Sequence, residues 1–425
     1  MTPVSAPGSS TEGTDMDHEA TATQPRRPAA AAGRGALLGA MFLMATSAIG
    51  PGFITQTTVF TAQLGAAFAF AIVVSILVDI AVQLNVWRVI GVSGLHAQDL
   101  ANKVLPGSGY VLAVLVVLGG AVFNIGNIGG TALGMNAMFG MDVKLGGAIS
   151  AAIAVAIFLS KRAGVAMDRI VVVLGVLMIS MVLYVAIVSD PPVGEALRQS
   201  VLPDEVSFLI ITTLIGGTVG GYITYAGAHR LVDSGITGTE HISMITRGSV
   251  TGIIVTGIMR ALLFLAVLGV VAGGAVLATD NPPASAFQHA LGDVGVRIFG
   301  VILWAASITS VIGASYTSVS FMAGFMGRLR EQRNLLVVGF ITVCAVAFLA
   351  LGKAPVTLLV LAGALNGLIL PVGLAIILWA AARRSGDLLK GYAYPKYLLV
   401  IGILVWMLTV YLGWKSLGGI SALWG

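Results

Sequence analysis

Apolar stretches of about 20 residues recur along this chain from residue 36 to residue 413, separated by short polar segments. A helix of that length crosses about 30 Å of hydrocarbon and satisfies its own backbone hydrogen bonds there. Charged residues make up only 10% of the chain, whereas they make up about a quarter of soluble domains. The sequence therefore predicts an all-α integral membrane protein.

The hydrophobic pattern predicts eleven membrane-spanning helices after a polar N-terminal tail. Residues 1–34 are rich in Ser, Thr, Ala and Pro and lack an apolar period, so we expect them to form a disordered cytoplasmic tail. Residues 35–425 are predicted to be a single transmembrane domain. The predicted spans are 36–64, 66–90, 109–138, 146–160, 169–188, 207–228, 249–272, 297–326, 335–351, 355–382 and 396–413.

The distribution of basic residues predicts the orientation of these spans. Most of the 23 Lys and Arg residues fall in segments that are cytoplasmic if the N-terminus is inside, as the positive-inside rule requires. An odd number of spans then puts the C-terminus outside. We expect a multi-pass protein of the inner (plasma) membrane, with short surface helices in the acidic outer segments 189–206 and 273–296. Cys344 is the single cysteine, so neither an internal disulfide nor a thiol metal cluster is expected.

Two predicted spans contain helix-breaking residues at matching positions. Span one carries GPGF at residues 50–53, and span six carries GGTVGGY at residues 216–222. The offset of five spans means that spans 1–5 and spans 6–10 would have opposite orientations in the membrane. Discontinuous helices at corresponding places in inverted halves are typical of transporters that bind substrate near the membrane midplane. The alternative is that these glycines only permit close helix packing.

Four segments resemble the natural-resistance-associated macrophage protein (NRAMP) family of divalent-metal transporters. The resemblance extends from about residue 36 to residue 413, and it implies a leucine-transporter-like fold with an inverted repeat and secondary transport by alternating access. The segments are GPGFITQT at 50–57, GVSGLHAQDLA at 91–101, AASITSVIGASYTS at 305–318 and LLVLAGALNGLILPVGL at 358–374.

The chain departs from the family at the positions that the resemblance assigns to the metal. The family's aspartate and asparagine on span one fall on Gly50 and Phe53. Its Met-Pro-His on span six falls on Gly220, Gly221 and Tyr222. A divalent cation needs oxygen or similar ligands to replace its hydration shell, so no metal site is assigned with confidence.

Three further departures change the charge of the expected pathway. Acidic residues of the family's span three fall on Asn124 and Asn127, and a polar residue of span seven falls on Arg260. An amide carries no proton at neutral pH, and a fixed positive charge repels a dication. The sequence therefore predicts that the transporter scaffold is kept while the metal site is degenerate.

A broken helix offers backbone N–H groups and a positive dipole end, which bind carboxylates without side-chain charge. We therefore predict a carrier for a small organic carboxylate. The resemblance includes bacterial NRAMP-like proteins with a GPGF-type break that are associated with 5-oxoproline use, which makes 5-oxoproline or an amino-acid derivative the first candidate. The predicted substrate-binding residues are Gly50, Gly52, Phe53, Thr55, Gln56, Thr218, Gly220, Gly221, Tyr222, Asn124, Asn127 and Arg260.

Arg260 stands at the centre of span seven, where a charge is costly and indicates a function. It is predicted either to attract an anion or to pair with Asp79, the acidic residue inside span two. Gln83 lies one helical turn from Asp79 and shares its face. Both interpretations of Arg260 remain open at this point.

The coupling ion is either sodium or a proton, and no cofactor is expected. Proton coupling would use Asp79 or His229, which lies near the inner end of span six. Sodium coupling is implied by the leucine-transporter-like fold, in which span-one carbonyls meet hydroxyls of span eight. The residues of this possible sodium site are Ala48, Pro51, Ala306, Thr309 and Ser310.

Other functions are weighed against this prediction. A divalent cation such as Mg²⁺, Mn²⁺ or Fe²⁺ could be held by carbonyls and water, and Mg²⁺ gives up its water most reluctantly. A sensor or scaffold ranks last because long inner loops are missing, and an enzyme is disfavoured because no nucleophile or acid–base constellation occurs. The net charge of +5 is explained by the inner loops rather than by a nucleic-acid partner. The expected partners are therefore a small-molecule or ion substrate and the lipid bilayer.

Overall fold

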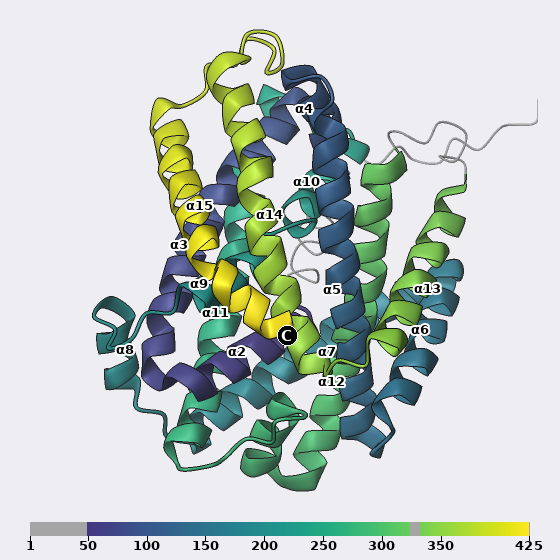
Figure 1. The fold of residues 1–425 in the computed structure, drawn as a ribbon, viewed down its shortest axis with the longest axis vertical. Helices are drawn as coiled ribbons and strands as arrows, with labels where there is room; N and C mark the ends of the chain where they lie inside the picture. Colours follow the sequence, from purple (N-terminus) through teal and green to yellow (C-terminus); the bar gives the residue numbers. More distant parts are fainter. Residues whose placement is uncertain (1–48, 324–331, 425) are drawn as a thin grey trace, which may run out of the picture.

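The computed structural model describes residues 49–323 and 332–424, and the described residues contain helices but no strand (Figure 1). The helices are α2 (Pro51–Leu64), α3 (Phe68–Ser93), α4 (Ala97–Val104), α5 (Ser108–Phe139), α6 (Val143–Leu159), α7 (Lys161–Val188), α8 (Val193–Val201), α9 (Phe208–Val219), α10 (Ile223–Asp233), α11 (Ile242–Ala272), α12 (Pro282–Ala323), α13 (Arg333–Leu351), α14 (Pro355–Arg383) and α15 (Lys396–Trp424), with short 3₁₀ turns η1 (Gly65–Ala67) and η2 (Thr239–His241).

Local sequence explains where several helices begin and end. Proline occupies the first turn of α2, where its missing N–H costs nothing. The Asp142 side chain accepts a hydrogen bond from the Leu145 N–H and caps α6. Gly94 ends α3 in the left-handed region at φ 69°, which glycine adopts without steric cost.

Each predicted span that lies within the described residues corresponds to a helix or a pair of helices, but the count of eleven is not confirmed. Eight described segments are long and apolar enough to cross a membrane, or nine if the bent pair α7 and α8 forms one span. The difference has two sources: α2 and α3 join through η1 into one segment of 43 residues, and α6 falls among the shorter apolar helices. Eleven spans therefore stay a prediction.

Some predicted features fall outside the described residues. They are the tail at 1–34, the first half of span one up to Ala48, and residues 324–326 at the end of span eight. The prediction of an interrupted first span is thus tested only from its second half, α2.

Helices that are five spans apart pack against each other. α3 lies along α11, α5 along α12, and α6 along α13 (Figure 1). A pseudo-two-fold axis between two inverted repeats brings such equivalent elements together. α14 crosses this arrangement and packs against α2, α5 and α9, so it contacts both interrupted regions.

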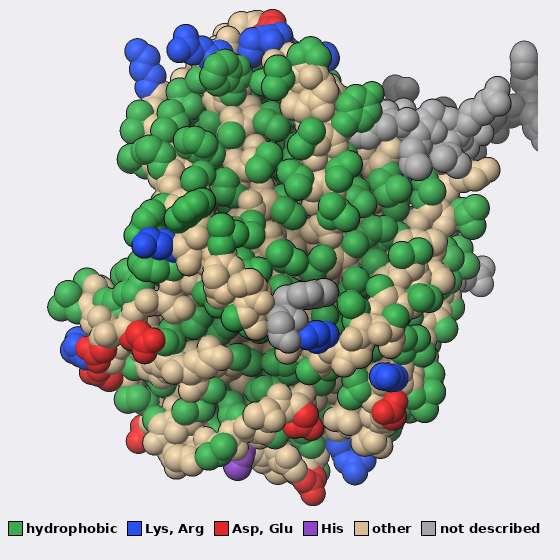
Figure 2. All heavy atoms as spheres, viewed as in Figure 1, with side chains coloured by type: hydrophobic (Ala, Val, Ile, Leu, Met, Phe, Trp, Pro, Cys, Tyr) green, Lys and Arg blue, Asp and Glu red, His purple; other side chains and the backbone are tan. Residues whose placement is uncertain are grey.

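The surface has a wide apolar belt between two charged ends. Figure 2 shows Lys and Arg gathered over α4 and the connection from α14 to α15, with hydrophobic side chains covering most of the middle. Exposed apolar residues of this kind include Leu118, Val173 and Leu404. Such a belt fits the hydrocarbon of a bilayer.

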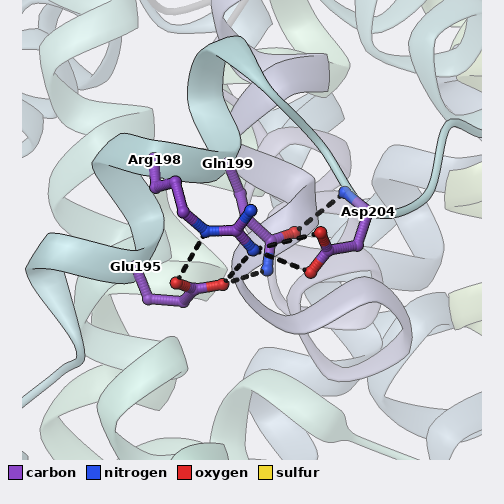
Figure 3. A network of polar contacts seen from close by, with 4 residues as sticks. All are labelled: Glu195, Arg198, Gln199 and Asp204. Carbon is purple, nitrogen blue, oxygen red and sulfur yellow. Dashed lines mark hydrogen bonds and ion pairs between the residues drawn. The ribbon is translucent and has the colours of Figure 1, made fainter.

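The first acidic segment contains a surface helix, as predicted, whereas the helix in the second segment begins with residues 282–287, which are buried. In the first segment α8 turns away from α7 by 104° and carries a network of Glu195, Arg198, Gln199 and Asp204 (Figure 3). In the second segment α12 starts at Pro282 and changes direction at Gly292, whose φ is 66°.

Candidate functional site

The second predicted break is a short non-helical segment inside the membrane-spanning region. α9 ends at Val219 and α10 begins at Ile223. Gly221 lies between them at φ 51°, a conformation that strongly favours glycine. All three residues between the two helices, 220–222, are buried.

The first predicted break coincides with the start of α2. Gly50 is in an extended conformation (φ −98°, ψ −171°), and the helix begins at the next residue, Pro51. The N–H groups of Gly52 and Phe53 fall in the first turn of the helix, where no intrahelical acceptor exists. Both residues are buried. The second break is therefore present in the chain, and at the first the described residues show the start of α2, which presents helix donors in the protein interior.

Arg260 links the start of α2 to the end of α9. Its guanidinium lies 4.4 Å from the centre of the Phe53 ring, and Nη1 donates a hydrogen bond of 3.0 Å to the Thr218 hydroxyl. The side chain is only 2% exposed. Nε and Nη2 have no hydrogen-bond partner among residues 49–323 and 332–424.

Asp79 lies beside this arginine but does not form a close ion pair with it. The carboxylate is 1% exposed and lies near both Arg260 and Thr218. Among the described residues no Asp or Glu oxygen lies within 4.0 Å of an Arg260 nitrogen. Asp79 Oδ1 is also left without a hydrogen-bond partner in the described part of the chain. The unpartnered nitrogens of Arg260 and the Asp79 carboxylate thus lie in the same buried region, so both interpretations of Arg260, attraction of an anion and pairing with Asp79, concern this one region.

A second group of predicted residues meets around Gly50. A Cβ atom at Gly50 would lie 2.7 Å from Ser310 Oγ and 3.9 Å from Asn127 Oδ1. Asn127 in turn lies near the Tyr222 hydroxyl of the second break. Pro51 fills the space next to Gly130 of α5. The start of α2 is therefore enclosed by α5 and α12.

Some of the remaining predicted residues form hydrogen bonds between helices, and others have a buried polar atom without a partner among the described residues. Gln56 Nε2 donates to the Leu359 carbonyl at 2.9 Å, which ties α2 to α14. Asn124 Nδ2 donates to Ser315 at 2.9 Å and so faces α12. The Thr55 and Tyr222 hydroxyls are buried and unpartnered within the described residues.

The possible sodium residues are only partly brought together. Ser310 lies next to Gly50, but the Thr309 hydroxyl donates to the carbonyls of Ala305 and Ala306 at 3.2 and 2.9 Å. Ala48 lies outside the described residues. The site for sodium stays a prediction.

His229 belongs to a different region, at the end of α10. Its Nε2 accepts the Ala97 N–H at 3.0 Å, and its ring stacks on His96 at 4.5 Å. His96 Nε2 lies 2.8 Å from Asp233. A cavity of about 220 Å³ lies here, lined by Ala226, His229, Arg230, Asp233, Ser234, Tyr316, Thr317 and Ser320.

Similarity to known proteins agrees with this architecture. The profile described as "Natural resistance-associated macrophage protein-like" matches residues 41–417, nearly the whole chain. The chain belongs to the Nramp family. A single-residue mutant of a manganese transporter of Eremococcus coleocola superposes with a TM-score of 0.72 at 17% identity, over 94% of this chain and 90% of that one. MhsT in complex with L-phenylalanine superposes with a TM-score of 0.66 at 16% identity, over 88% and 98%.

Two relatives are similar in sequence over most of their length. The uncharacterized membrane protein YcsG of Bacillus subtilis is 52% identical over 377 residues, which cover 89% of this chain and 93% of that protein. An uncharacterized membrane protein of Haemophilus influenzae is 49% identical over 384 residues, covering 90% and 96%. Members of the Nramp family are transporters, so this chain is a multi-pass membrane transporter rather than an enzyme.

Space is limited at two of the positions that the sequence resemblance assigns to the metal. At Gly50 a side chain would collide with Ser310, and at Gly220 it would come within 2.8 Å of the Asn366 carbonyl. No group of three or more His, Cys, Asp or Glu residues that could hold a metal occurs in the described ranges. These positions therefore offer backbone and close packing in place of side-chain ligands.

Asn366 of α14 is a polar residue of this region that the sequence prediction missed. Its Nδ2 donates to the carbonyls of Gly119 and Ala362 at 3.0 and 2.8 Å. Its Oδ1 lies against Gly221 and is unpartnered among the described residues. An amide in the middle of an apolar span was the signal that could have found it, because a buried amide is costly unless it is bonded.

Proposed function

We propose that this Nramp-family protein is a secondary active transporter for a small organic carboxylate, such as 5-oxoproline or an amino-acid derivative. The observation that carries the proposal is the environment of Arg260, a buried guanidinium with two nitrogen atoms unpartnered in the described part of the chain. Leaving a buried charge unpaired is strongly unfavourable. A carboxylate between Arg260 and the start of α2 would receive charge-assisted hydrogen bonds from the one and backbone N–H groups from the other.

The proposed ligand contacts follow the geometry around the first break. Phe53 and Thr218 hold the guanidinium in place, while Gly50 and Gly52 add no side chain of their own at the start of α2. Tyr222 of the second break lies near Asn127, which also lies near Gly50, whereas Gly220 and Gly221 pack against Asn366 of α14. Thr55, Gln56 and Asn124 contribute neutral polar groups. MhsT, which has this fold, is in complex with an amino acid, and that supports an organic ligand.

Transport of a divalent cation is the second candidate, because a structural neighbour is a manganese transporter. Unpaired buried oxygen atoms of Gln56, Asp79 and Asn124 favour it among the described residues. The fixed charge of Arg260 opposes it, since a dication and a guanidinium repel each other strongly in a medium of low dielectric constant.

Ligand-dependent thermal stabilisation of the purified protein distinguishes these candidates. We expect 5-oxoproline or a related carboxylate to raise the melting temperature, and Mn²⁺ and Mg²⁺ to have little effect, because a ligand that binds only the folded state stabilises it. Each ligand is tested with sodium and with choline in its place. Stabilisation by micromolar Mn²⁺, together with no response to any carboxylate, would refute the proposal.

The proposed orientation has the N-terminus inside and the C-terminus outside, in the inner (plasma) membrane. The concentration of Lys and Arg at the end that carries α4 and the α14–α15 connection supports it (Figure 2), by the positive-inside rule. Cysteine accessibility in intact cells tests it: a cysteine introduced at Asp387 should be protected from a membrane-impermeant reagent, and one at Val276 should react.

A further inference from the structure

The cavity at the end of α10 lies outside the proposed site at Arg260 and has a chemistry of its own. Residues of α10 from Ala226 to Asp233 and residues of α12 from Tyr316 to Ser320 line it. Its volume of about 220 Å³ has room for at least about seven water molecules, at roughly 30 Å³ each. A small organic molecule therefore fits inside, and the groups on the wall decide which kind.

Arg230 brings to this cavity a positive charge that has no close ion pair. The side chain is exposed and lines the cavity, and no Asp or Glu oxygen lies within 4.0 Å of its nitrogens in the described part of the chain. A second guanidinium, that of Arg333, lies 4.0 Å from the centre of the Tyr316 ring. Its Nε is buried and has no hydrogen-bond partner among the described residues. Two cations beside one cavity favour an anion as its occupant.

Asp233 is an acidic residue of the wall, but another side chain already pairs with it. Its Oδ1 lies 2.8 Å from His96 Nε2. One paired carboxylate against two guanidinium groups leaves the cavity positive overall. Within residues 49–323 and 332–424 no group of three or more His, Cys, Asp or Glu residues could hold a metal, so the wall favours an organic anion over a metal ion.

His229 adds a neutral donor to the same wall. Its Nε2 accepts the Ala97 N–H at 3.0 Å, so in the neutral imidazole the hydrogen is on Nδ1. Nδ1 lies 3.5 Å from Ser320 Oγ, whose own hydroxyl donates to the Thr317 carbonyl at 2.6 Å. A guanidinium next to an N–H donor is a combination that binds a carboxylate by charge-assisted and neutral hydrogen bonds together.

The cavity also lies on the helix faces that lead from the proposed site. His229 follows Tyr222 of the second break by seven positions, and Thr317 follows Ser310 by seven positions. Seven residues are about two helical turns, so each pair shares one face of its helix. Ser310 lies next to Gly50 at the start of α2. A ligand that leaves the start of α2 along these two faces therefore arrives at the cavity.

We propose that this cavity is a second carboxylate-binding site, in which Arg230 receives the carboxylate between the Arg260 site and the end of the molecule that carries α4. The inference rests on the proposed function for the class of ligand, and it adds a site that Arg260 does not form. The hydrogen bond from Ala97 of α4 to His229 places the cavity toward the Lys- and Arg-rich end seen in Figure 2. Because Arg230 is exposed, the ligand keeps part of its hydration there and binds more weakly than at a buried guanidinium.

Protection of an introduced cysteine from alkylation measures the occupancy of this cavity. Ser234 is exposed and lines the cavity, so Ser234→Cys in the full-length protein is the reporter, and the parent protein with its buried Cys344 is the blank. The reagent is the neutral N-ethylmaleimide, and chloride keeps the ionic strength constant. We expect 5-oxoproline to slow the reaction about threefold at a concentration of about twice its dissociation constant, because the free fraction falls as 1 + [L]/Kd. The uncharged amide of 5-oxoproline should give no protection.

Arginine variants in the Ser234→Cys background assign the protection to this cavity. Arg230→Gln should abolish it. Arg247→Gln is the matched control, because Arg247 is an exposed arginine of α11 that does not line the cavity, and it should keep the protection. Arg260→Gln should keep it as well, because the two sites use different guanidinium groups.

Three results would overturn the inference. If 5-oxoproline raises the melting temperature but gives no protection up to tens of millimolar, the second site is refuted while the proposed function stands. Protection that survives Arg230→Gln, or that is lost in Arg260→Gln, refutes a separate site at Arg230. If neither protection nor thermal stabilisation is seen, both proposals fail. Should Ser234→Cys fail to fold, Thr317→Cys on the α12 wall is the second reporter.

Discussion

Arginine occupies opposite environments on the surface helix α8 and in the membrane-spanning interior. Arg198 on α8 is about half exposed and donates to Glu195 at 2.6 Å and to Asp204 at 2.9 Å (Figure 3). Arg260 on α11 is buried, donates one hydrogen bond to a neutral hydroxyl and keeps two nitrogens unpartnered among the described residues. Arg198, which water can reach, donates to two carboxylates, whereas the buried Arg260 keeps two nitrogens without an acceptor among the described residues.

The difference between Arg198 and Arg260 indicates which of the two arginines has a role other than stabilising the fold. An exposed ion pair contributes little, because water competes for both partners. A buried guanidinium is retained against a large cost of desolvation, so its open donors call for an explanation other than stability. The proposed ligand site supplies one, and the comparison can be tested by changing each arginine in the same way.

The largest effect is expected from Arg260→Gln. Replacing the guanidinium removes at least one charge-assisted hydrogen bond and a buried positive charge near the start of α2, so carboxylate binding should weaken by about 100-fold or more, or roughly 3 kcal/mol. The measurement is the dissociation constant from isothermal titration. Arg198→Gln is the matched control and should bind like the wild type. Equal affinity in the two variants would mean that Arg260 serves only packing.

A substitution at the second break, Gly221→Ala, tests whether the backbone there fixes the position of Arg260. Gly221→Ala forces a Cβ into the left-handed region, at about 1–2 kcal/mol, and into the Asn366 amide that already fills the space. We expect a lower melting temperature and poor yield in detergent, because Thr218, which holds Arg260, lies one turn before this break.

Gly52→Ala is the control for the same substitution at the first break. Its Cβ would meet Gln56 Nε2 at an ordinary 3.6 Å, and the helical position accepts alanine. The variant should keep the wild-type melting temperature, and any loss would appear in ligand affinity. If Gly221→Ala is as stable as Gly52→Ala, the second break is more adaptable than its geometry indicates.

A smaller effect is expected from Phe53→Leu, which removes the ring beneath the guanidinium but keeps an apolar side chain. A desolvated cation–π contact contributes about 0.5–2 kcal/mol, so carboxylate affinity should fall by roughly 3- to 30-fold. Phe53→Tyr retains the ring face and should stay closer to the wild type. A larger loss in Phe53→Tyr than in Phe53→Leu would contradict a role for the ring in orienting Arg260.

The sequence was sufficient for the fold class and for the break between α9 and α10, because apolar length and helix-breaking residues act locally. Resemblance to a family gave the leucine-transporter-like fold, which the comparisons confirmed. The number of spans was harder to predict from the sequence, because η1 joins α2 to α3 without a polar loop.

Side-chain pairing was harder to predict than chain topology. Arg260 and Asp79 are 181 positions apart in the chain, so no periodicity relates them, and whether they pair depends on packing across α9. Asn366 was missed for the same reason: its partners Gly119 and Gly221 come from α5 and from the second break. Hydrogen bonds between distant spans require the assembled structure.

The smallest effect is expected for Arg198, the exposed arginine that pairs with Glu195 and Asp204. Hydrogen bonds from Arg198 and Gln199 lower the pKa of Glu195 from 4.5 to about 2. A lowered pKa in the folded state means that the network stabilises α8 above pH 4.5 and loses that contribution as the pH falls toward 2. A ¹³C NMR titration of the Glu195 carboxyl should give a midpoint near 2 in the wild type, and Arg198→Gln should move it back toward 4.5. Because both groups are exposed, the melting temperature at neutral pH should hardly change. An unchanged midpoint would show that the network in Figure 3 is not formed in solution, and the contrast between the two arginines would then rest on Arg260 alone.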